Sequence, residues 1–414
     1  MYDKAIIVVS FEDYTVNLGG VNKVILAHQE ILISHGYKVI FICPCHIAKG
    51  LLGKEKWLVR VNGELQMIED QNGVASFCRS FYVKGIQIHH LKNINIIQLE
   101  SILNKVDADI FFYLHDYSTI IPDGNGTLLR ENNTLYDYEH FDVDDYKNSP
   151  FYKKAKDIRL FFSEYSDRMK FIAPSDACKE IWSSVYPEYR DKIIVIYHQK
   201  EVGEYRRPQI QNEKIRVAFV GKQSSVKGWD IFEKVIETQK NNNLIYEFYS
   251  CGEDREQLEY VKNIKVDFHI GLDAMTQALR DQRIDIVLLL SICPETYSYT
   301  YYESKAADTY MLALANSGNI AAQIINVGNG KIFDDKEQLI SYLNNAEVVK
   351  QDLKQFRESV HMAPKSLIEN DEFLALFSSK QFASSTDSRY TPGIISRVLC
   401  AIYNTQEQIK SVLK

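Results

Sequence analysis

The segment IDIVLLLSICPETYSYTYYES, residues 284–304, joins an apolar run to two glutamates. We expect residues 284–290 to form a buried strand, because the run is short, continuous and aliphatic. Glu295 then lies in the loop after that strand, and Glu303 lies near the start of the following helix. Ligands of open α/β sheets bind beyond the carboxyl ends of the strands. The segment therefore predicts a binding site that includes both carboxylates.

Strands and helices alternate through the second half of the chain on either side of this segment. We expect strands at 215–220, 244–249 and 264–268, and helices at 229–239, 254–262 and 273–281. Such alternation is typical of a doubly wound parallel sheet.

The first half of the chain follows the same scheme. Its expected elements are strands at 4–9, 38–42, 109–114 and 171–173, and a helix at 21–35. The polar stretch 198–213, which carries Gly203 and Pro208, is the best candidate for a linker between the halves.

These patterns, with a length of 414 residues, predict an α/β protein with two Rossmann-like, doubly wound domains that face each other across a cleft. We place the first domain at 1–200 and the second at 201–390. A C-terminal helix at 391–414 can cross back to the first domain.

The amino-acid composition argues against several classes of binding partner and cellular location. A net charge of -7 disfavours a nucleic acid, whose phosphates need a basic face. No stretch approaches the roughly 18 consecutive apolar residues of a membrane span. The short apolar run near the N-terminus lacks a signal-peptide cleavage site, so we expect a cytoplasmic protein. Seven scattered cysteines suit reduced thiols, and no zinc-ligand spacing occurs, so we expect no metal.

Four motifs, taken in order, resemble those of the retaining glycosyltransferase family 4, whose members have the GT-B fold. They are NLGGVNKVILAHQEILISHGYKV (17–39), FYLHDYS (112–118), FVGKQSSVKG (219–228) and PETYSYTYYES (294–304). The resemblance covers most of the chain and implies that the first domain holds the acceptor and the second holds the nucleotide sugar. It implies a metal-independent transferase that moves a hexosyl or deoxyhexosyl group from a nucleoside diphosphate and retains the anomeric configuration.

Two lysines follow the strand at 215–220. Lys222 and Lys227 are five positions apart in a short loop before a helix, so both can turn toward one anion. Fixed cations and helix-start amides can stabilise a departing diphosphate without a metal. The family often has arginine at the first position, and Lys222 replaces a bidentate fork with a point charge that still binds phosphate.

By resemblance, Glu295 contacts hydroxyls of the donor sugar and Glu303 contacts the ribose. Carboxylates suit this role because they accept two hydrogen bonds from a diol. Between them, Thr296, Tyr297 and Ser298 offer backbone amides to the phosphates.

His115 follows a predicted strand and is in register with the family's histidine, so we expect it to hydrogen-bond the donor sugar. A lone histidine is also compatible with a structural role. Gly19 and Gly20 either form a simple turn or allow close approach of the backbone to the diphosphate. No residue is recognisable as a covalent nucleophile or as a general base.

Two positions depart from the family pattern, which has a glycine and a proline where this chain has Asp308 and Tyr310. Aspartate tolerates the left-handed conformation at a helix end, so we expect the fold to survive.

The FDVDDY stretch at 141–146 is interpreted as an acidic surface segment, not as the D-x-D site of metal-dependent transferases. The stretch 147–162 predicts an amphipathic helix on the first domain, and an anionic membrane surface is the alternative for it.

The resemblance therefore implies a glycosyltransferase of class EC 2.4 in the synthesis of bacterial surface polysaccharides or glycoconjugates. The nucleotide sugar is the donor substrate, and no cofactor is expected. The acceptor is a glycan, a lipid-linked molecule or a protein. We expect the enzyme in the cytoplasm, with peripheral contact to the inner face of the membrane as an option. Two alternatives stay open: a transferase-like partner subunit without turnover, and a nucleotide-sugar 2-epimerase.

Overall fold

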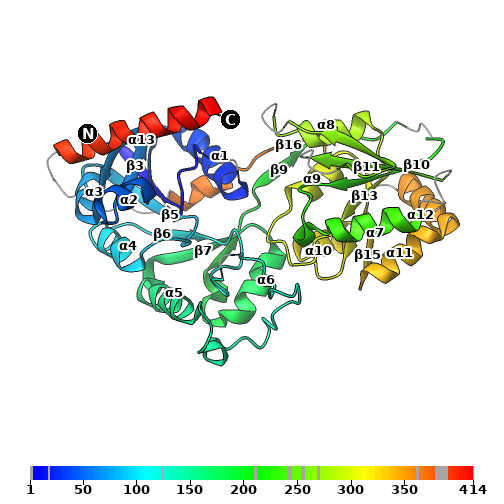
Figure 1. Ribbon diagram of the computed structural model, residues 1–414, viewed down its shortest axis with the longest axis horizontal. Helices are drawn as coiled ribbons and strands as arrows, with labels where there is room; N and C mark the ends of the chain where they lie inside the picture. Colours follow the sequence, from blue (N-terminus) through cyan, green and yellow to red (C-terminus); the bar gives the residue numbers. More distant parts are fainter. Residues whose placement is uncertain are drawn as a thin grey trace.

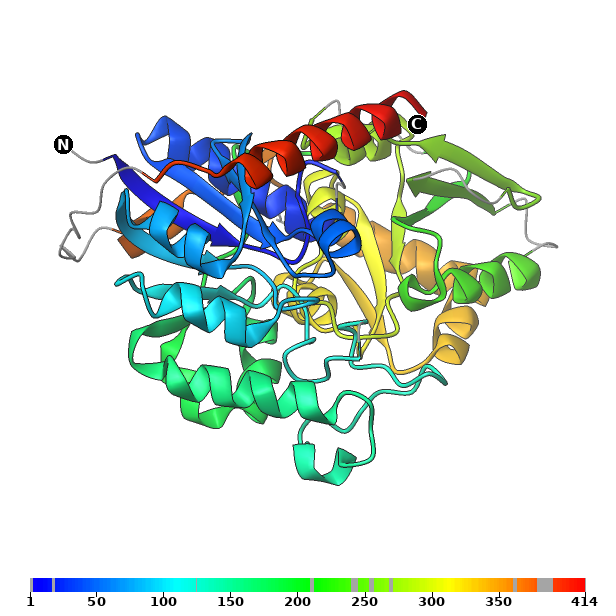
Figure 2. The same cartoon turned by 60° about the vertical axis from the view of Figure 1, so that its left-hand side comes forward.

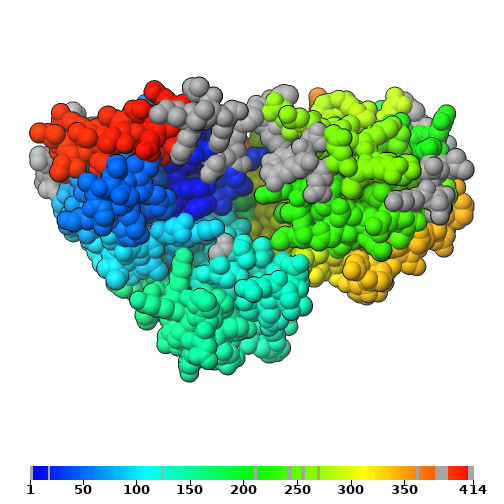
Figure 3. Space-filling model, viewed as in Figure 1, coloured from blue at the N-terminus to red at the C-terminus, as the bar shows by residue number. Residues whose placement is uncertain are grey.

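The computed structural model describes residues 3–16, 19–123, 125–208, 212–239, 245–252, 257–267, 271–359, 363–377 and 390–413. Two sheets with helices on their faces form two domains (Figure 1). A space-filling view shows a hollow between the first domain and the second (Figure 3).

The first domain is built on an eight-stranded sheet in the order β4-β3-β2-β1-β5-β6-β7-β8. Its strands are β1 (Lys4–Val9), β2 (Lys38–Pro44), β3 (Trp57–Val61), β4 (Glu64–Glu69), β5 (Tyr82–Ile88), β6 (Ile110–Tyr113), β7 (Met169–Ala173) and β8 (Ile193–Val195). Its helices are α1 (Gly20–Ser34), α2 (His46–Leu52), α3 (Gln71–Cys78), α4 (Ile96–Leu103), α5 (Tyr152–Glu164) and α6 (Asp176–Val185). Strands β2, β1, β5, β6, β7 and β8 are parallel. The apolar side chains of β1 are buried on both faces of the sheet.

The antiparallel hairpin β3–β4 is an addition to the expected sheet. Asn62 and Gly63 connect its strands, and both have positive φ values, 51° and 90°. An Asn-Gly pair is a strong signal for such a turn, because both residues tolerate this conformation.

The second domain contains a parallel six-stranded sheet in the order β12-β11-β10-β13-β14-β15. Its strands are β10 (Ile215–Val220), β11 (Tyr246–Gly252), β12 (Val261–Lys265), β13 (Ile286–Leu289), β14 (Tyr310–Leu314) and β15 (Gly330–Phe333). Its helices are α7 (Trp229–Gln239), α8 (Ala274–Asp281), α9 (Tyr299–Ala306), α10 (Asn319–Val327), α11 (Lys336–Asn344) and α12 (Ala346–Glu358). The strand order reverses between β10 and β13, so the loops after these two strands flank the position where such sheets bind ligands.

One expected helix is wrong. Of the range 254–262, residues 257–260 are coil and turn, and β12 begins at Val261, while 253–256 lie outside the described residues. The expected strand at 264–268 correspondingly starts earlier. Val261 and Ile264 have helical spacing, but parallel pairing with β11 determines the local structure, because tertiary context overrides weak local preference.

The polar stretch 198–213 is partly a strand. Within it, β9 (Gln199–Val202) pairs antiparallel with β16 (Ser366–Glu369), so the chain crosses between the domains twice along one two-stranded ribbon. After β16, helix α13 (Ile394–Leu413) lies across the first domain (Figures 1 and 2).

Side-chain hydrogen bonds fix α13 to the first domain. The amide of Ile68 in β4 donates to Ser396 Oγ at 3.0 Å, and the Tyr403 hydroxyl donates to Asp13 at 2.8 Å. The last helix therefore belongs structurally to the first domain, although it follows the second in sequence.

Several smaller expectations are confirmed. Asp308 adopts the left-handed conformation, with a φ of 59°, and its Oδ2 accepts from the Arg207 amide at 2.9 Å. Helix α5 buries Ile158, Phe161 and Phe162 in the core of the first domain. Asp144 of the 141–146 segment is exposed at the surface.

No helix in the described part of the chain is long and apolar enough to cross a membrane.

Candidate active site

The loop after β10, residues 221–228, packs closely against the end of β13. It leaves the strand at Gly221 (φ 113°), forms the short helix Ser225–Lys227, and enters α7 through Gly228 (φ 79°). A Cβ atom at Gly228 would lie 2.1 Å from the carbonyl oxygen of Leu290, so only glycine fits there. This contact holds the lysine-bearing loop beside the loop that carries Glu295.

Lys227 and Glu295 form an ion pair. Lys227 Nζ lies 2.5 Å from Glu295 Oε1, and Ser291 Oγ donates to the same oxygen at 2.8 Å. Burial alone would lower the pKa of Lys227, but the Glu295 carboxylate outweighs it and raises the pKa. Lys222 is exposed and makes no hydrogen bond or ion pair with a described residue. Of the two predicted lysines, the structure thus brings only Lys227 into contact with a predicted glutamate.

The backbone on either side of Glu295 is held by the strand-like contact with Gly318, which has a φ of 63°. A Cβ atom at Gly318 would lie 2.7 Å from the Glu295 amide nitrogen. The Glu295 amide donates to Ser317 at 3.1 Å, and its carbonyl accepts from the Asn319 amide at 2.9 Å. The carboxylate therefore projects from a rigid segment.

The next residue connects the two domains. Thr296 Oγ1 donates to the carbonyl of His115 at 2.6 Å, and Ser175 Oγ donates to the carbonyl of Thr296 at 2.7 Å. Both partners come from the first domain. The PETYS loop is therefore positioned by both domains.

The start of α9 presents backbone donors. Ser298 caps the helix by accepting from the Tyr301 amide at 3.3 Å. Tyr297 is buried, with its ring stacked on Tyr302 at a centroid distance of 4.6 Å, so only its backbone can serve a ligand. Within the described ranges, the amides of Thr296, Tyr297 and Ser298 donate no hydrogen bond. These amides lie immediately before the first turn of α9, where the positive end of the helix dipole favours an anion.

Glu303 lies one turn into α9 and is buried. The residue is 6% exposed, and no donor among the described residues reaches its Oε2. Burial raises the pKa of Glu303 to about 7, although attraction to Lys23 opposes this shift. A buried carboxylate oxygen without a donor is costly, and hydroxyl groups of a ligand would satisfy it.

Gly19 and Gly20 lie across the cleft, at the start of α1. A Cβ atom at either glycine would meet nothing within 4 Å, so close protein packing does not explain them. One turn later, Lys23 Nζ lies 5.9 Å from the ring centroid of Tyr299 in α9. The glycine loop and the start of α9 therefore face each other.

His115 is part of a chain of hydrogen bonds inside the first domain. His115 Nε2 lies 2.8 Å from His89 Nδ1, and His89 Nε2 lies 3.4 Å from Gln87 Oε1. Because an amide oxygen only accepts, His89 Nε2 carries a proton, and His115 Nε2 then donates to His89. Burial, followed by the nearby histidines, lowers the pKa of His115 well below its usual value. A neutral His115 keeps Nδ1 as an acceptor.

Residues that were not predicted from the sequence also hold this site together. Ser291, Gly318, Lys23, Ser175 and His89 all contact or position a predicted site residue. Ser291 and Lys23 lie within four residues of predicted positions and had a local signal. The other three depend on contacts between segments that are far apart in the sequence.

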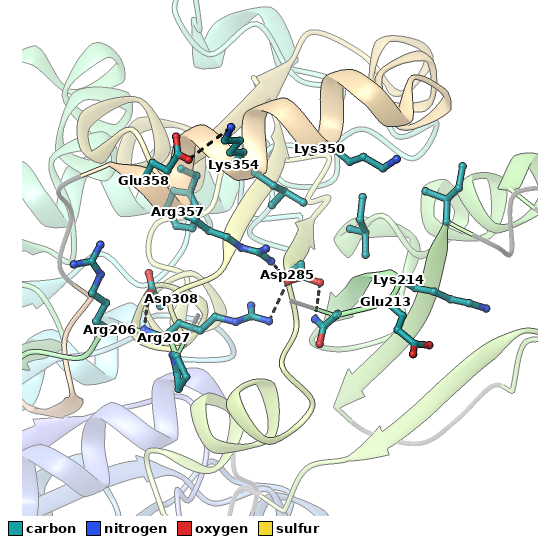
Figure 4. Close-up of a pocket in the computed structure, with 16 residues that line it drawn as sticks. Arg206, Arg207, Glu213, Lys214, Asp285, Asp308, Lys350, Lys354, Arg357 and Glu358 are labelled. Carbon is teal, nitrogen blue, oxygen red and sulfur yellow. Dashed lines mark hydrogen bonds and ion pairs between the residues drawn. The ribbon is translucent and has the colours of Figure 1, made fainter. Parts of the chain in front are cut away.

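A cavity of about 690 Å³ lies at the other end of the second sheet (Figure 4). There Asp285 accepts from Arg207 at 3.0 Å, from Asn212 at 2.8 Å and from the Arg216 amide at 2.9 Å. Arg357 of α12 also contacts Asp285. This cluster connects the segment after β9 to the sheet and is remote from the carboxyl ends of the strands, so it is structural.

No group of histidine, cysteine, aspartate and glutamate side chains that could hold a metal ion occurs in the described part of the chain. The residues named above offer amides, carboxylates, a lysine and neutral imidazole acceptors.

No family model and no curated protein matches the sequence. Among solved structures, sucrose-phosphate synthase from Thermosynechococcus elongatus matches with a TM-score of 0.55 at 11% identity, over 86% of this chain and 93% of that chain. A glycosyltransferase from Rickettsia africae matches with a TM-score of 0.53 at 14% identity, over 86% and 92%. HepE from Anabaena, in complex with UDP and glucose, matches with a TM-score of 0.52 at 13% identity, over 85% and 92%. The chain has the GT-B fold.

Proposed function

We propose that this chain is a glycosyltransferase that binds a nucleoside diphosphate sugar between its two domains and transfers the sugar to an acceptor hydroxyl. The observation that carries the proposal is the buried Oε2 of Glu303, which has no donor among the described residues and lies one turn from the amides that begin α9. A ribose diol and a diphosphate supply the donors and the negative charge that these two features require. HepE, which has the same fold, was solved with UDP-glucose, and this supports the proposal.

In this proposal the diphosphate binds the amides of residues 296–298 together with Lys222 and Lys227. Glu303 binds the ribose, and Glu295 and His115 Nδ1 bind the sugar. Lys227 leaves its ion pair with Glu295, or shares it, when the diphosphate binds. Gly19 and Gly20 allow the backbone to approach the phosphates from the first domain.

We infer a retaining, metal-independent reaction. The acceptor oxygen attacks the anomeric carbon from the face that the diphosphate leaves. The bond from that carbon to the diphosphate oxygen breaks, its electron pair stays on the diphosphate, and the proton of the acceptor passes to the diphosphate. Lys227 and the helix-start amides offset the growing charge of the leaving group.

We also propose a cytoplasmic role in the synthesis of polysaccharides or glycoconjugates, which the family resemblance supports. The proposed acceptors include lipid-linked molecules at the inner face of the membrane. The nucleotide sugar is the donor substrate, and the proposal includes no cofactor.

The test is a turnover assay with UDP-, GDP- and dTDP-sugars in EDTA, which measures release of the nucleoside diphosphate. We expect one donor class to turn over, and Glu295→Gln to abolish most of the release. Activity that requires added manganese would refute metal independence. Conversion of the donor to an isomeric sugar would identify an epimerase, and nucleotide binding without turnover would favour a partner subunit.

A further inference from the structure

A second pocket, of about 150 Å³, lies on the first domain beside the proposed donor site. The ends of β1, β5 and β6, the start of α1 and one face of α5 line it. Asp116 in its wall directly follows His115, whose carbonyl accepts from Thr296 of the PETYS loop. Val21, also in the wall, directly follows Gly20. The pocket is therefore adjacent to both halves of the proposed donor site.

Asp116 is held in one orientation. His90 Nε2 lies 3.0 Å from its Oδ2, and the Ser118 amide donates to its Oδ1 at 2.9 Å. His90 Nδ1 accepts from the Lys92 amide at 2.8 Å, so the ring proton is on Nε2 and points at the carboxylate. Gly126 packs so closely that a Cβ atom there would lie 2.5 Å from Oδ2.

These contacts keep Asp116 ionised. Burial alone would raise the pKa of Asp116, but His90 and Ser118 outweigh it and lower the pKa. The side chain is 34% exposed, so a ligand can reach it. An oriented, ionised carboxylate is a strong acceptor for a hydroxyl group.

Two lysines converge on the same pocket. Lys92 follows β5, and Lys154 comes from α5, within the lysine- and aromatic-rich stretch 147–162. Burial and the nearby charge of Lys92 together lower the pKa of Lys154. Asp116 attracts Lys154 but does not cancel this effect. Both lysines carry positive charge into the pocket wall, so a bound anion would be attracted to both.

We propose that this pocket is the acceptor subsite and that it takes a sugar or polyol with a phosphate or carboxylate group near the reacting hydroxyl. This inference rests on the proposed function. Lys92 and Lys154 bind the anionic group, and Asp116 accepts a hydrogen bond from a hydroxyl. Asp116 is thus a positioning residue for the acceptor, and Lys154 of the stretch 147–162 contributes to substrate binding.

The test compares glycerol 3-phosphate, glycerate and glycerol as probes, by saturation-transfer NMR on the full-length protein. UDP, or GDP or dTDP if one of those binds, is present at saturation so that the probe's phosphate cannot occupy the donor site. We expect both anionic probes to bind at least about 10-fold more tightly than glycerol, since charge-assisted hydrogen bonds are strong. The phosphate and carboxylate arms show which anion the pocket prefers.

Lys154→Met should weaken binding of the preferred anionic probe about 10-fold or more. Lys153→Met is the matched control, because Lys153 is the neighbouring, exposed lysine of α5 and should leave binding unchanged. Lys92→Met repeats the test from another element if Lys154→Met folds poorly, as judged by its melting temperature.

Equal binding of glycerol and the anionic probes would overturn the inference, as would equal binding by the Lys153 and Lys154 variants. The nucleotide titrations in the same samples separate the two claims. If the nucleotide binds and the anionic probes do not, only the acceptor inference fails. If no nucleotide binds to the wild-type protein, the proposed function fails.

Discussion

Asp285 and Glu303 are buried acids at opposite ends of the second sheet. At the amino end, Asp285 accepts from Arg207, Arg357, Asn212 and a backbone amide, and the protein fully compensates its charge (Figure 4). At the carboxyl end, Glu303 has an oxygen that no described residue satisfies, and burial raises its pKa to about 7.

This difference in hydrogen-bond partners distinguishes a carboxylate with a structural role from one with a role in ligand binding. Removing a buried carboxylate that has all its donors leaves its cationic partners unpaired and destabilises the fold. A buried carboxylate that lacks a donor costs stability, and the protein has reason to keep it only if something else supplies the donor.

We expect the largest effect from Asp285→Ala. The change leaves Arg207 and Arg357 close together without their carboxylate, which should reduce the free energy of unfolding by about 3–5 kcal/mol. Urea unfolding measures it. Glu213→Ala is the control, because Glu213 lines the same cavity but is exposed. A loss below about 1 kcal/mol would show that Asp285 is not structural.

Glu295→Gln should act on turnover. If Glu295 meets the sugar where positive charge develops, the turnover number should fall about 10²-fold or more. Because the change also releases Lys227 from its ion pair, affinity for the nucleoside diphosphate should stay the same or rise. Kinetics and calorimetry measure the two quantities. Turnover like that of the wild type would remove Glu295 from the chemistry.

A smaller effect is expected for Lys227→Met. Loss of a charge-assisted bond to the diphosphate should weaken nucleotide binding by about 1.5–3 kcal/mol, roughly 10- to 150-fold. Calorimetry checks this, with Lys234→Met as the control, since Lys234 is exposed and pairs only with Glu237 among the described residues. Unchanged affinity in the Lys227 variant would place the phosphates elsewhere.

Much of the second domain could be predicted from local patterns. The apolar runs at 215–220 and 284–290 define the two strands of the switch point, and the PETYS segment follows from its position after the second run. The left-handed conformation of Asp308 was predicted from the glycine that the resembled family has at this place, since aspartate tolerates a positive φ.

Other features depend on contacts that a local pattern does not contain. Strand β12 forms at a position with helical spacing because β11 offers a pairing edge. Gly318 is required only because the Glu295 backbone passes close to it. The role of His89 depends on β5 and β6 lying side by side, which brings it to His115.

The most direct test of the central claim uses the pKa of Glu303. Its folded pKa, about 7, is above the ordinary value of 4.5, so the raised pKa favours the folded protein below pH 4.5, and this contribution is lost as pH rises through 7. Ribose hydroxyls would donate to the ionised form and favour it. Nucleotide binding should therefore tighten as Glu303 ionises.

The measurement is calorimetric titration of the nucleoside diphosphate at pH 6 and pH 8, with the wild-type protein and Glu303→Gln. The variant corrects for ionisation of the nucleotide's own phosphate. We predict that affinity of the wild type increases about 10-fold more between these pH values than that of the variant, as a pKa near 7 requires. An identical pH dependence in the two proteins, with equal affinities, would contradict a ribose contact at Glu303 and with it the proposed donor site.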